Sequence, residues 1–415
     1  MLVIKNPLIL SRLKDDCKMQ NLNNFFHNSA EKVANQFFKR IKYGSLKVFF
    51  PSGKIVYFKG SNLGIEADIK LSNFLMVEKL LRKGKVGFAE SYMNRDFSTS
   101  NLKNLLIFAQ QNESSYLDNK QGKFFYRLIS KINNYLNQNT KSKSQKNISY
   151  HYDLGNKFYE LWLDASMNYS SGYFALPGDD LSKAQLNKYQ KIIEPMQLNE
   201  GTTLLEIGCG WGGFSSYVAK NFKTKINAIT NSKKQFEYTS RMISNEGLNE
   251  KVTVELKDYR DINGKYDYIS SIEMFEAVGQ KYWPVYFEKI KNCLNDSGLA
   301  TFQIITISED KRKLYQKNQD FIQQYIFPGG VLPSKKQIFQ TAASLGLKLN
   351  EFNSFGNSYA NTLSIWNEQF QNAWHLIAEQ GYSIRFKRVW EYYFSYCEVG
   401  FITKATDVSH FLLKL

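Results

Sequence analysis

The chain has 415 residues, 43% of them hydrophobic, which is enough apolar material for two folded domains and excludes a disordered protein. No stretch approaches the roughly 20 apolar residues that a membrane-spanning helix needs, so a soluble or peripheral protein is expected. The net charge of +16 lies almost wholly in residues 1–147, which hold 25 Lys and Arg against 10 Asp and Glu, while residues 148–415 hold 29 against 28. This asymmetry indicates an anionic partner, either nucleic acid or a membrane with anionic lipid.

The N-terminal part shows the pattern of a small α+β domain over residues 1–120. Two alternating segments, residues 45–50 and 54–60, flank Pro51-Ser52-Gly53 and predict a β-hairpin. A further strand is expected at residues 66–73, and helices are expected at about 74–83 and 102–110.

Residues 121–147 form a separate segment between the two predicted domains. Residues 121–137 place apolar side chains on one face at helical spacing and basic side chains elsewhere, which predicts a basic amphipathic helix. Such a helix fits a membrane surface and fits equally well an ordinary helix packed on its own domain. The polar run that follows predicts a linker.

From about residue 199 the pattern changes to strands that alternate with helices. Strands are expected at residues 202–208, 225–230, 251–256, 266–272 and 299–306, and helices at 213–222, 234–247 and 282–295. This alternation predicts an α/β, Rossmann-like domain over residues 148–415, with a mostly parallel, doubly wound sheet covered by helices on both faces.

The run "LLEIGCGWGGFSS" (204–216) contains a glycine turn that fits two cofactors. Its GxGxxG spacing is that of a dinucleotide site, but the next strand ends in Thr230 and Asn231, where a dinucleotide fold needs an acidic residue. S-adenosylmethionine is therefore favoured over a nicotinamide cofactor. Glu206 can balance its cationic amino end, and Asp258 and Tyr259 of "LKDYRD" can accept from the adenine amino group and pack on the ring.

Six blocks in order resemble the cyclopropane-fatty-acyl-phospholipid synthases and mycolic acid cyclopropane synthases. They are "HYDLGNKFYELWLDASMNYSSGYF" (151–174), "LEIGCGWGGF" (205–214), "KDYRDI" (257–262), "SIEMFEAVGQKYWPVYF" (271–287), "FIQQYIFPGGVLPS" (321–334) and "FGNSYANTLSIW" (355–366). The resemblance implies methyl transfer from S-adenosylmethionine to a cis double bond of an acyl chain, followed by proton loss that closes a ring. It also implies that residues 1–120 form a lipid-engaging domain.

The resemblance also implies roles for individual residues. Tyr169 and Ser170 would close over the cofactor with Gly208 and Gly210, and the adenosine and ribose would be held by Thr230, Gln235 and Tyr259. A bound bicarbonate would act as base, and its contacts would be Glu276, Tyr359, the backbone at Ser171 and Ile305, and Gln303 as an uncharged donor where the family has a His. A water-poor tunnel lined by aromatic rings would shelter the alkyl cation, with candidates at Tyr169, Tyr173, Phe174, Phe275, Tyr325 and Tyr359.

Three positions depart from the family pattern. Ser171 replaces a Cys, Gln303 replaces a His and Glu273 replaces a Gly. Gln303 has no titratable proton at neutral pH, although its amide can donate to an anion and accept from a donor, so proton handling is altered. Glu273 can supply a carboxylate of its own or point outward from a helix, and the sequence leaves both open.

The functional hypothesis is an S-adenosylmethionine-dependent C-methyltransferase acting on unsaturated phospholipid acyl chains. The product is a cyclopropane or a methylene or methyl-branched chain, the latter with a redox partner enzyme. An RNA methyltransferase and a non-catalytic lipid-binding protein are the alternatives from other classes. The scattered Cys17, Cys209, Cys293 and Cys397 predict neither disulfide nor metal site and fit a cytoplasmic enzyme, peripheral at the inner membrane face. Whether the chain forms a homodimer is left open.

Overall fold

The computed structural model describes residues 31–116, 154–317 and 319–415. The chain divides into two compact units, residues 1–124 and 125–415. The basic helix and linker predicted at residues 121–147 lie outside the described residues, so the domain boundaries stay a prediction. Within the described ranges, no helix has the length and apolar character that crossing a bilayer requires.

The N-terminal unit is a four-stranded sheet with helices, as the sequence predicts. Its strands, in the order β2-β1-β3-β4, are β1 (Tyr43–Phe49), β2 (Ile55–Lys59), β3 (Asn62–Leu71) and β4 (Phe97–Ser98). Its helices are α2 (Leu75–Met93), α3 (Leu102–Gln111) and α4 (Glu113–Tyr116). The predicted hairpin is confirmed, because β1 and β2 pair antiparallel with Val48 opposite Val56. The helix expected to end near residue 83 instead continues to Met93, past a kink where Gly84 has a φ of +59°.

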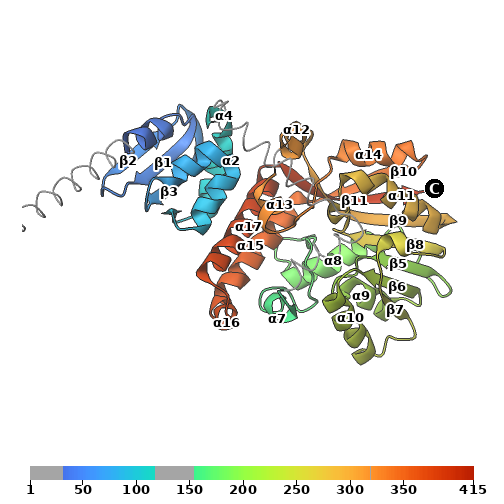
Figure 1. Cartoon of the computed structure of the whole chain (residues 1–415). Helices are drawn as coiled ribbons and strands as arrows, with labels where there is room; N and C mark the ends of the chain where they lie inside the picture. The colour runs from blue at the N-terminus through green and yellow to red at the C-terminus, as the bar shows by residue number, and fades with distance from the viewer. Residues whose placement is uncertain (1–30, 117–153, 318) are drawn as a thin grey trace, which may run out of the picture. The chain divides into compact units, whose positions relative to one another are not determined.

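The second unit contains a seven-stranded sheet in the order β10-β11-β9-β8-β5-β6-β7 (Figure 1). The strands are β5 (Thr203–Ile207), β6 (Lys225–Thr230), β7 (Val252–Leu256), β8 (Tyr266–Ile272), β9 (Leu294–Ile307), β10 (Lys348–Ser354) and β11 (Thr406–Lys414). Only the pairings made by β11 are antiparallel; the other four are parallel. The predicted mostly parallel α/β sheet is confirmed.

The helices of this unit connect and cover the strands. They are α7 (Asn156–Tyr159), α8 (Leu181–Ile193), α9 (Gly213–Asn221), α10 (Lys233–Asn245), α11 (Trp283–Cys293), α12 (Glu309–Lys317), α13 (Phe321–Tyr325), α14 (Lys335–Ser344), α15 (Gly356–Asn372), α16 (Trp374–Glu379) and α17 (Ile384–Ile402). Three short 3-10 turns, η1 (Tyr259–Asp261), η2 (Phe275–Ala277) and η3 (Gln280–Tyr282), join them.

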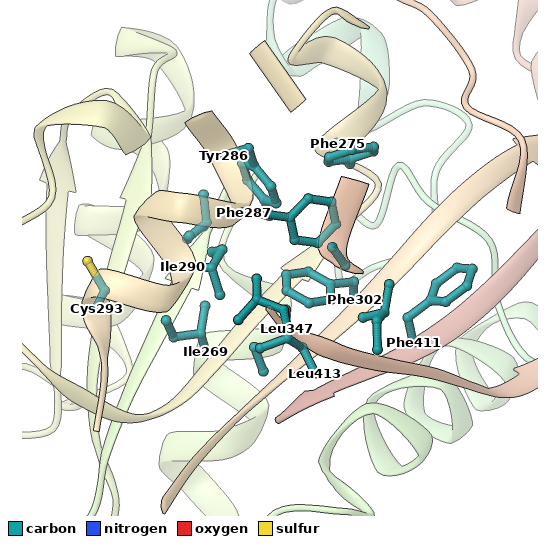
Figure 2. Close-up of a cluster of buried hydrophobic side chains, with 14 of the residues drawn as sticks. Ile269, Phe275, Tyr286, Phe287, Ile290, Cys293, Phe302, Leu347, Phe411 and Leu413 are labelled. Carbon is teal, nitrogen blue, oxygen red and sulfur yellow. The ribbon is translucent and has the colours of Figure 1, made fainter. Parts of the chain in front are cut away.

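Each face of the sheet has its own hydrophobic core. Because side chains alternate along a strand, Leu204 of β5 points to a core with α8, α9 and α10, whereas its neighbour Leu205 points to a core with α11 and α14. Figure 2 shows the second core, where Phe287 and Phe302 pack with Phe411 of β11. Both faces of the sheet are thus covered, as is usual for parallel sheets.

The strand order reverses between β5 and β8. The chain goes from β5 to β6 on one side and later to β8 on the other, so the loops at the carboxyl ends of these strands diverge. Open α/β sheets bind ligands at such a point. The glycine turn and Glu273 both follow directly after these two strands.

Candidate active site

The glycine turn lies between β5 and α9 and requires glycine for two different reasons. Gly208 has a φ of +85°, and a Cβ there would lie 2.9 Å from Cγ of Met274. Gly210 has a φ of +54°, and a Cβ there would meet no atom within 4 Å. The left-handed backbone favours glycine at both positions, and the turn at Gly210 faces open space that a ligand can enter.

That space is a cavity of about 170 Å³ at the carboxyl ends of β5, β6 and β8. All nine residues predicted to bind the cofactor line it, namely Tyr169, Ser170, Glu206, Gly208, Gly210, Thr230, Gln235, Asp258 and Tyr259. Glu273 lines the same cavity. The structure therefore brings together residues from four separate sequence blocks, and their individual roles stay predictions.

Glu206 is a buried carboxylate at one end of the cavity. Its exposed fraction is 2%, and the hydroxyl of Ser215 donates to its Oε2. Burial, as the main cause, raises the pKa of Glu206 to about 7, because the charged form is poorly solvated there. The charge of Lys188 opposes this shift in part, and a cationic ligand end would add a second counter-charge.

The other predicted ligand contacts lie at the ends of β6 and β7. The Thr230 hydroxyl donates to Oε1 of Gln235 at 2.9 Å, which fixes the Gln235 amide at the first turn of α10. Asp258 accepts two hydrogen bonds from the guanidinium of Arg260, both at 2.7 Å, and one from Asn231 at 3.1 Å. The sequence analysis missed Arg260, whose charge keeps Asp258 ionised. With a further hydrogen bond from the backbone N of Arg260 at 3.0 Å, Asp258 already accepts four, about the capacity of a carboxylate, so an adenine amino group would have to share or displace one of these donors.

These features fit S-adenosylmethionine. The glycine turn leaves space for a ligand next to the protein backbone, and Glu206 can bind a cationic amino end. Asp258 lines the same cavity from the end of a different strand. The next strand, β6, does not end in an acidic residue. The site therefore lacks the carboxylate that binds the ribose hydroxyls of a dinucleotide.

Glu273 forms a second site that adjoins the cavity. Its carboxylate accepts hydrogen bonds from Ser171 N at 2.9 Å, Gln303 Nε2 at 2.7 Å and Tyr359 Oη at 2.7 Å. The residue follows the end of β8 and is not on a helix, so the alternative that it points outward from a helix is wrong. Burial raises its pKa, and these donors and the charge of Lys188 oppose that shift.

Glu276 lies three residues further and has fewer partners. Ile305 N donates to its Oε1 at 2.5 Å, and its buried Oε2 has no partner among the described residues. Burial, with the charge of Glu273 second, raises the pKa of Glu276 to about 8. Of the residues predicted to hold bicarbonate, Ser171, Gln303 and Tyr359 therefore bind Glu273, and only Ile305 binds Glu276.

The sequence analysis did not find His410, which orients Gln303. The two residues are directly opposite in the β9–β11 ladder, and Nε2 of His410 lies 2.9 Å from Oε1 of Gln303. Burial lowers the pKa of His410 to about 3, so the ring is neutral. Because Oε1 is an acceptor, the ring proton must be on Nε2, while Nδ1 accepts from Asn353 at 3.3 Å. The Gln303 amide is thereby held with Nε2 towards Glu273.

Lys188 was also missed, because a lysine in an amphipathic helix normally faces solvent. Here it is fully buried on α8, and its ammonium donates to Ser170 Oγ at 2.7 Å and Gln185 Oε1 at 2.5 Å. Burial lowers its pKa to about 8, and the opposing charges come from Glu273, Asp164 and Glu206 in that order. Lys188 thus places a positive charge between two carboxylates of the cavity.

The predicted aromatic lining holds for some residues and not for others. Tyr169 lines the cavity, and its ring lies 5.3 Å from that of Trp366, which in turn lies 6.2 Å from Tyr359. Phe275 instead packs in the hydrophobic core against Trp283 and Tyr286, and Figure 2 shows it among the core side chains. In the described ranges, no cluster of three or more His, Cys, Asp or Glu side chains could hold a metal ion.

The fold and the cavity define the class: the second unit is an S-adenosylmethionine-dependent methyltransferase. The family model "Mycolic acid cyclopropane synthetase" matches residues 139–411, and the chain belongs to that family. It is 36% identical over 345 residues to the cyclopropane-fatty-acyl-phospholipid synthase of Escherichia coli K12, covering 82% of this chain and 86% of that one. It is therefore a methyltransferase of the cyclopropane-fatty-acyl-phospholipid synthase type.

Two further comparisons agree. The tuberculostearic acid methyltransferase UfaA1 of Mycobacterium tuberculosis is 30% identical over 373 residues, with 87% of each chain covered. The crystal structure of mycolic acid cyclopropane synthase CmaA1 complexed with SAH and CTAB superposes with a TM-score of 0.61 at 27% identity, over 65% of this chain and 98% of that chain.

Proposed function

We propose that the protein transfers a methyl group from S-adenosylmethionine to the double bond of an unsaturated acyl chain in a membrane phospholipid. One observation carries the proposal: a carboxylate with three donors, Glu273, lies in the wall of the cofactor cavity. An N- or O-methyltransferase needs a base for an acidic proton, whereas methylation of an alkene needs a buried base for a carbon-bound proton. The names of the relatives support a lipid substrate.

When bound, S-adenosylmethionine supplies an electrophilic methyl group, and its transfer to the alkene leaves a positive charge on the acyl chain. The protein must then keep water away from that charge and remove a proton. The ring of Tyr169 lines the cavity and packs on Trp366, which in turn packs on Tyr359 beside Glu273, and the Tyr169 ring can stabilise a nearby cation. Glu206, at the glycine turn, serves to orient the cationic amino end of the cofactor.

Two products remain compatible with this site. Direct loss of a proton from the new methyl group closes a cyclopropane ring. Loss from a neighbouring chain carbon leaves a methyl-branched alkene, and a hydride shift followed by loss from the methyl group leaves a methylene product. The relatives include both a cyclopropane-fatty-acyl-phospholipid synthase and a fatty acid methyltransferase. We favour the cyclopropane. A homodimer, and a redox partner enzyme for a branched product, stay predictions.

We further propose that the N-terminal unit brings the enzyme to anionic membranes, in line with the excess of basic residues in 1–147. One face of its sheet exposes aromatic and basic side chains together. Ile55 and Tyr57 of β2 are 49% and 70% exposed, and Lys47 on the neighbouring β1 lies over the Tyr57 ring, with Nζ 5.2 Å from the centroid. Aromatic rings beside lysines suit the headgroup region of a bilayer.

The proposed activity is tested by expressing the protein in a host with monounsaturated phospholipids and analysing the fatty acids by gas chromatography with mass detection. A fatty acid heavier by one methylene unit is expected, at the expense of a monounsaturated one. Hydrogenation separates the products, since a branched alkene takes up hydrogen under mild conditions that leave a cyclopropane intact. An unchanged fatty-acid profile with active cofactor binding would contradict the proposal.

A further inference from the structure

Glu273 has a backbone conformation that is unusual for its residue type. Its φ is +51°, in the left-handed region, and its N–H donates to the carbonyl of Gln303 at 2.8 Å. This conformation costs a non-glycine residue about 1 kcal/mol. The sequence resemblance expects a glycine at this position, which would adopt the conformation freely. A carboxylate has thus been introduced on a backbone that does not favour it, which points to a role for the side chain.

The contacts of Glu273 include three of the five expected of the bicarbonate. Ser171, Gln303 and Tyr359 were predicted to surround that ion, and all three donate to the Glu273 carboxylate at 2.7 to 2.9 Å. A bicarbonate would have to compete for the same donors while lying next to a carboxylate of like charge. Like charges at this separation repel strongly in a buried site. The residues of this chain therefore do not fit a bound bicarbonate.

We propose that the Glu273 carboxylate replaces bicarbonate as the catalytic base and accepts the proton that the methylated acyl chain loses. This inference rests on the proposed function. In the step, a C–H bond of the transferred methyl group breaks, and its electron pair forms the new bond between the methyl carbon and the cationic carbon, which closes the ring. The proton moves to a carboxylate oxygen of Glu273. It leaves to solvent when the product departs, which restores the carboxylate.

The surrounding groups prepare Glu273 for this step. Three donors stabilise its ionised form, whereas Glu276 has a single donor and a buried oxygen without a partner in the described structure. When two buried carboxyl groups repel each other, the one with more hydrogen-bond donors ionises first. Glu273 therefore carries the negative charge, and Glu276 carries the proton. Of these two carboxyl groups, Glu273 is the one that lines the cofactor cavity, where the methyl group would be delivered.

Three variants distinguish catalysis by the Glu273 carboxylate from catalysis by a bound bicarbonate. Glu273→Gln keeps the shape of the side chain and removes the base. Glu273→Gly restores the family residue and leaves space where the carboxylate was. Glu288→Gln, on the exposed face of α11, is the matched control. All are assayed on monounsaturated phospholipid vesicles in degassed, bicarbonate-free buffer. Sodium bicarbonate is then titrated in, with sodium chloride as the ionic control.

The wild type and Glu288→Gln should be equally active with and without bicarbonate. Glu273→Gln should lose about 100- to 10,000-fold in rate, the usual loss when acid–base assistance is removed, with its affinity for S-adenosylmethionine unchanged. Glu273→Gly should be slow and should gain rate as bicarbonate is added. A wild type that needs added bicarbonate, or a fully active Glu273→Gln, would overturn the proposal.

A binding measurement keeps this inference separate from the proposed function. Calorimetry with bicarbonate on the cofactor-loaded protein should show no binding to the wild type and binding to Glu273→Gly. Bicarbonate binding to the wild type would overturn the role of Glu273 whatever the substrate is. A wild type that binds S-adenosylmethionine but methylates no phospholipid would instead contradict the proposed function.

Discussion

His410 and Gln303 are paired across two neighbouring strands, with Nε2 of the imidazole 2.9 Å from Oε1 of the amide. The contact leaves the amide nitrogen of Gln303 as the group that faces Glu273, at 2.7 Å. Without His410, the amide could rotate and turn its oxygen towards the carboxylate. His410 is therefore a positioning residue, and it acts on Glu273 through Gln303.

We expect His410→Leu to lower kcat by about tenfold, the effect of losing roughly 1.4 kcal/mol of transition-state stabilisation. The loss of the Gln303 donor should raise the pKa of Glu273, so the acidic limb of the kcat profile should move to higher pH. His410→Gln, which keeps a donor near the position of Nε2, should restore the profile. Replacing the exposed His375 by Leu is the control. A lower kcat with an unmoved profile would mean that His410 is merely structural.

The raised pKa of Glu276 predicts that the protein loses stability as the pH rises. The folded state holds the proton up to about pH 8, whereas the unfolded chain releases it near the usual glutamate pKa of 4.5. Between these values the unfolded state binds fewer protons, so the free energy of unfolding falls with pH, by at most about 1.4 kcal/mol per unit. Below pH 4.5 both states are protonated and the effect is absent.

Glu276→Gln should remove this dependence. Its stability relative to the wild type should increase steadily from pH 5 to pH 8, whatever fixed offset the buried amide adds. Urea unfolding at several pH values measures the difference, and Glu288→Gln provides an exposed control. Parallel curves for the wild type and Glu276→Gln would show that Glu276 is ionised in the folded protein.

The glycine turn predicts a loss of cofactor affinity without a loss of fold. Gly210→Ala puts a methyl group into the open space of the cavity, and we expect the affinity for S-adenosylmethionine to fall at least about tenfold, or 1.4 kcal/mol. Gly247→Ala is the matched control, because Gly247 has a φ of +68°, is exposed and also has free space around a Cβ. Both variants carry similar backbone strain, so equal affinities in calorimetry would mean that the turn does not hold the cofactor.

The proposed membrane surface predicts salt-dependent binding. The full-length protein should bind vesicles rich in anionic lipid, and the binding should weaken with added salt, because surface charges are screened over about 8 Å at physiological ionic strength. Tyr57→Ser should weaken binding further at any salt concentration, since it removes an exposed ring beside Lys47. Co-sedimentation measures both effects. Equal binding to neutral and anionic vesicles would contradict the electrostatic part.

The sequence predicted the fold well, because its strands and helices alternate with clear hydrophobic periods. The strand expected at residues 225–230 is β6 with the same bounds, and the cofactor residues meet because parallel strands end at one edge of the sheet. The role of Glu273 as the base was not predictable from these hydrophobic patterns. The direction of Glu273 depends on one positive φ at the end of β8, and the pairing of His410 with Gln303 joins residues 107 positions apart. Lys188 shares the buried face of α8 with Leu181, Ala184 and Ile192, but its charge made it an unexpected core residue.

Glu206 predicts how cofactor binding depends on pH. The pKa of Glu206 is about 7 without a bound ligand, so about half of the molecules carry a proton on this carboxyl group at neutral pH. The proton must leave before the carboxylate can balance a cationic amino end. The affinity for S-adenosylmethionine should therefore rise between pH 6 and pH 7.5, by at most about tenfold per unit below the pKa. Binding at pH 7 should release protons, which calorimetry in two buffers of different ionisation enthalpy detects. Glu206→Gln should bind more weakly, with neither the pH dependence nor the proton release. A wild-type affinity that is flat over this range would show that the cationic end of the cofactor does not lie at Glu206.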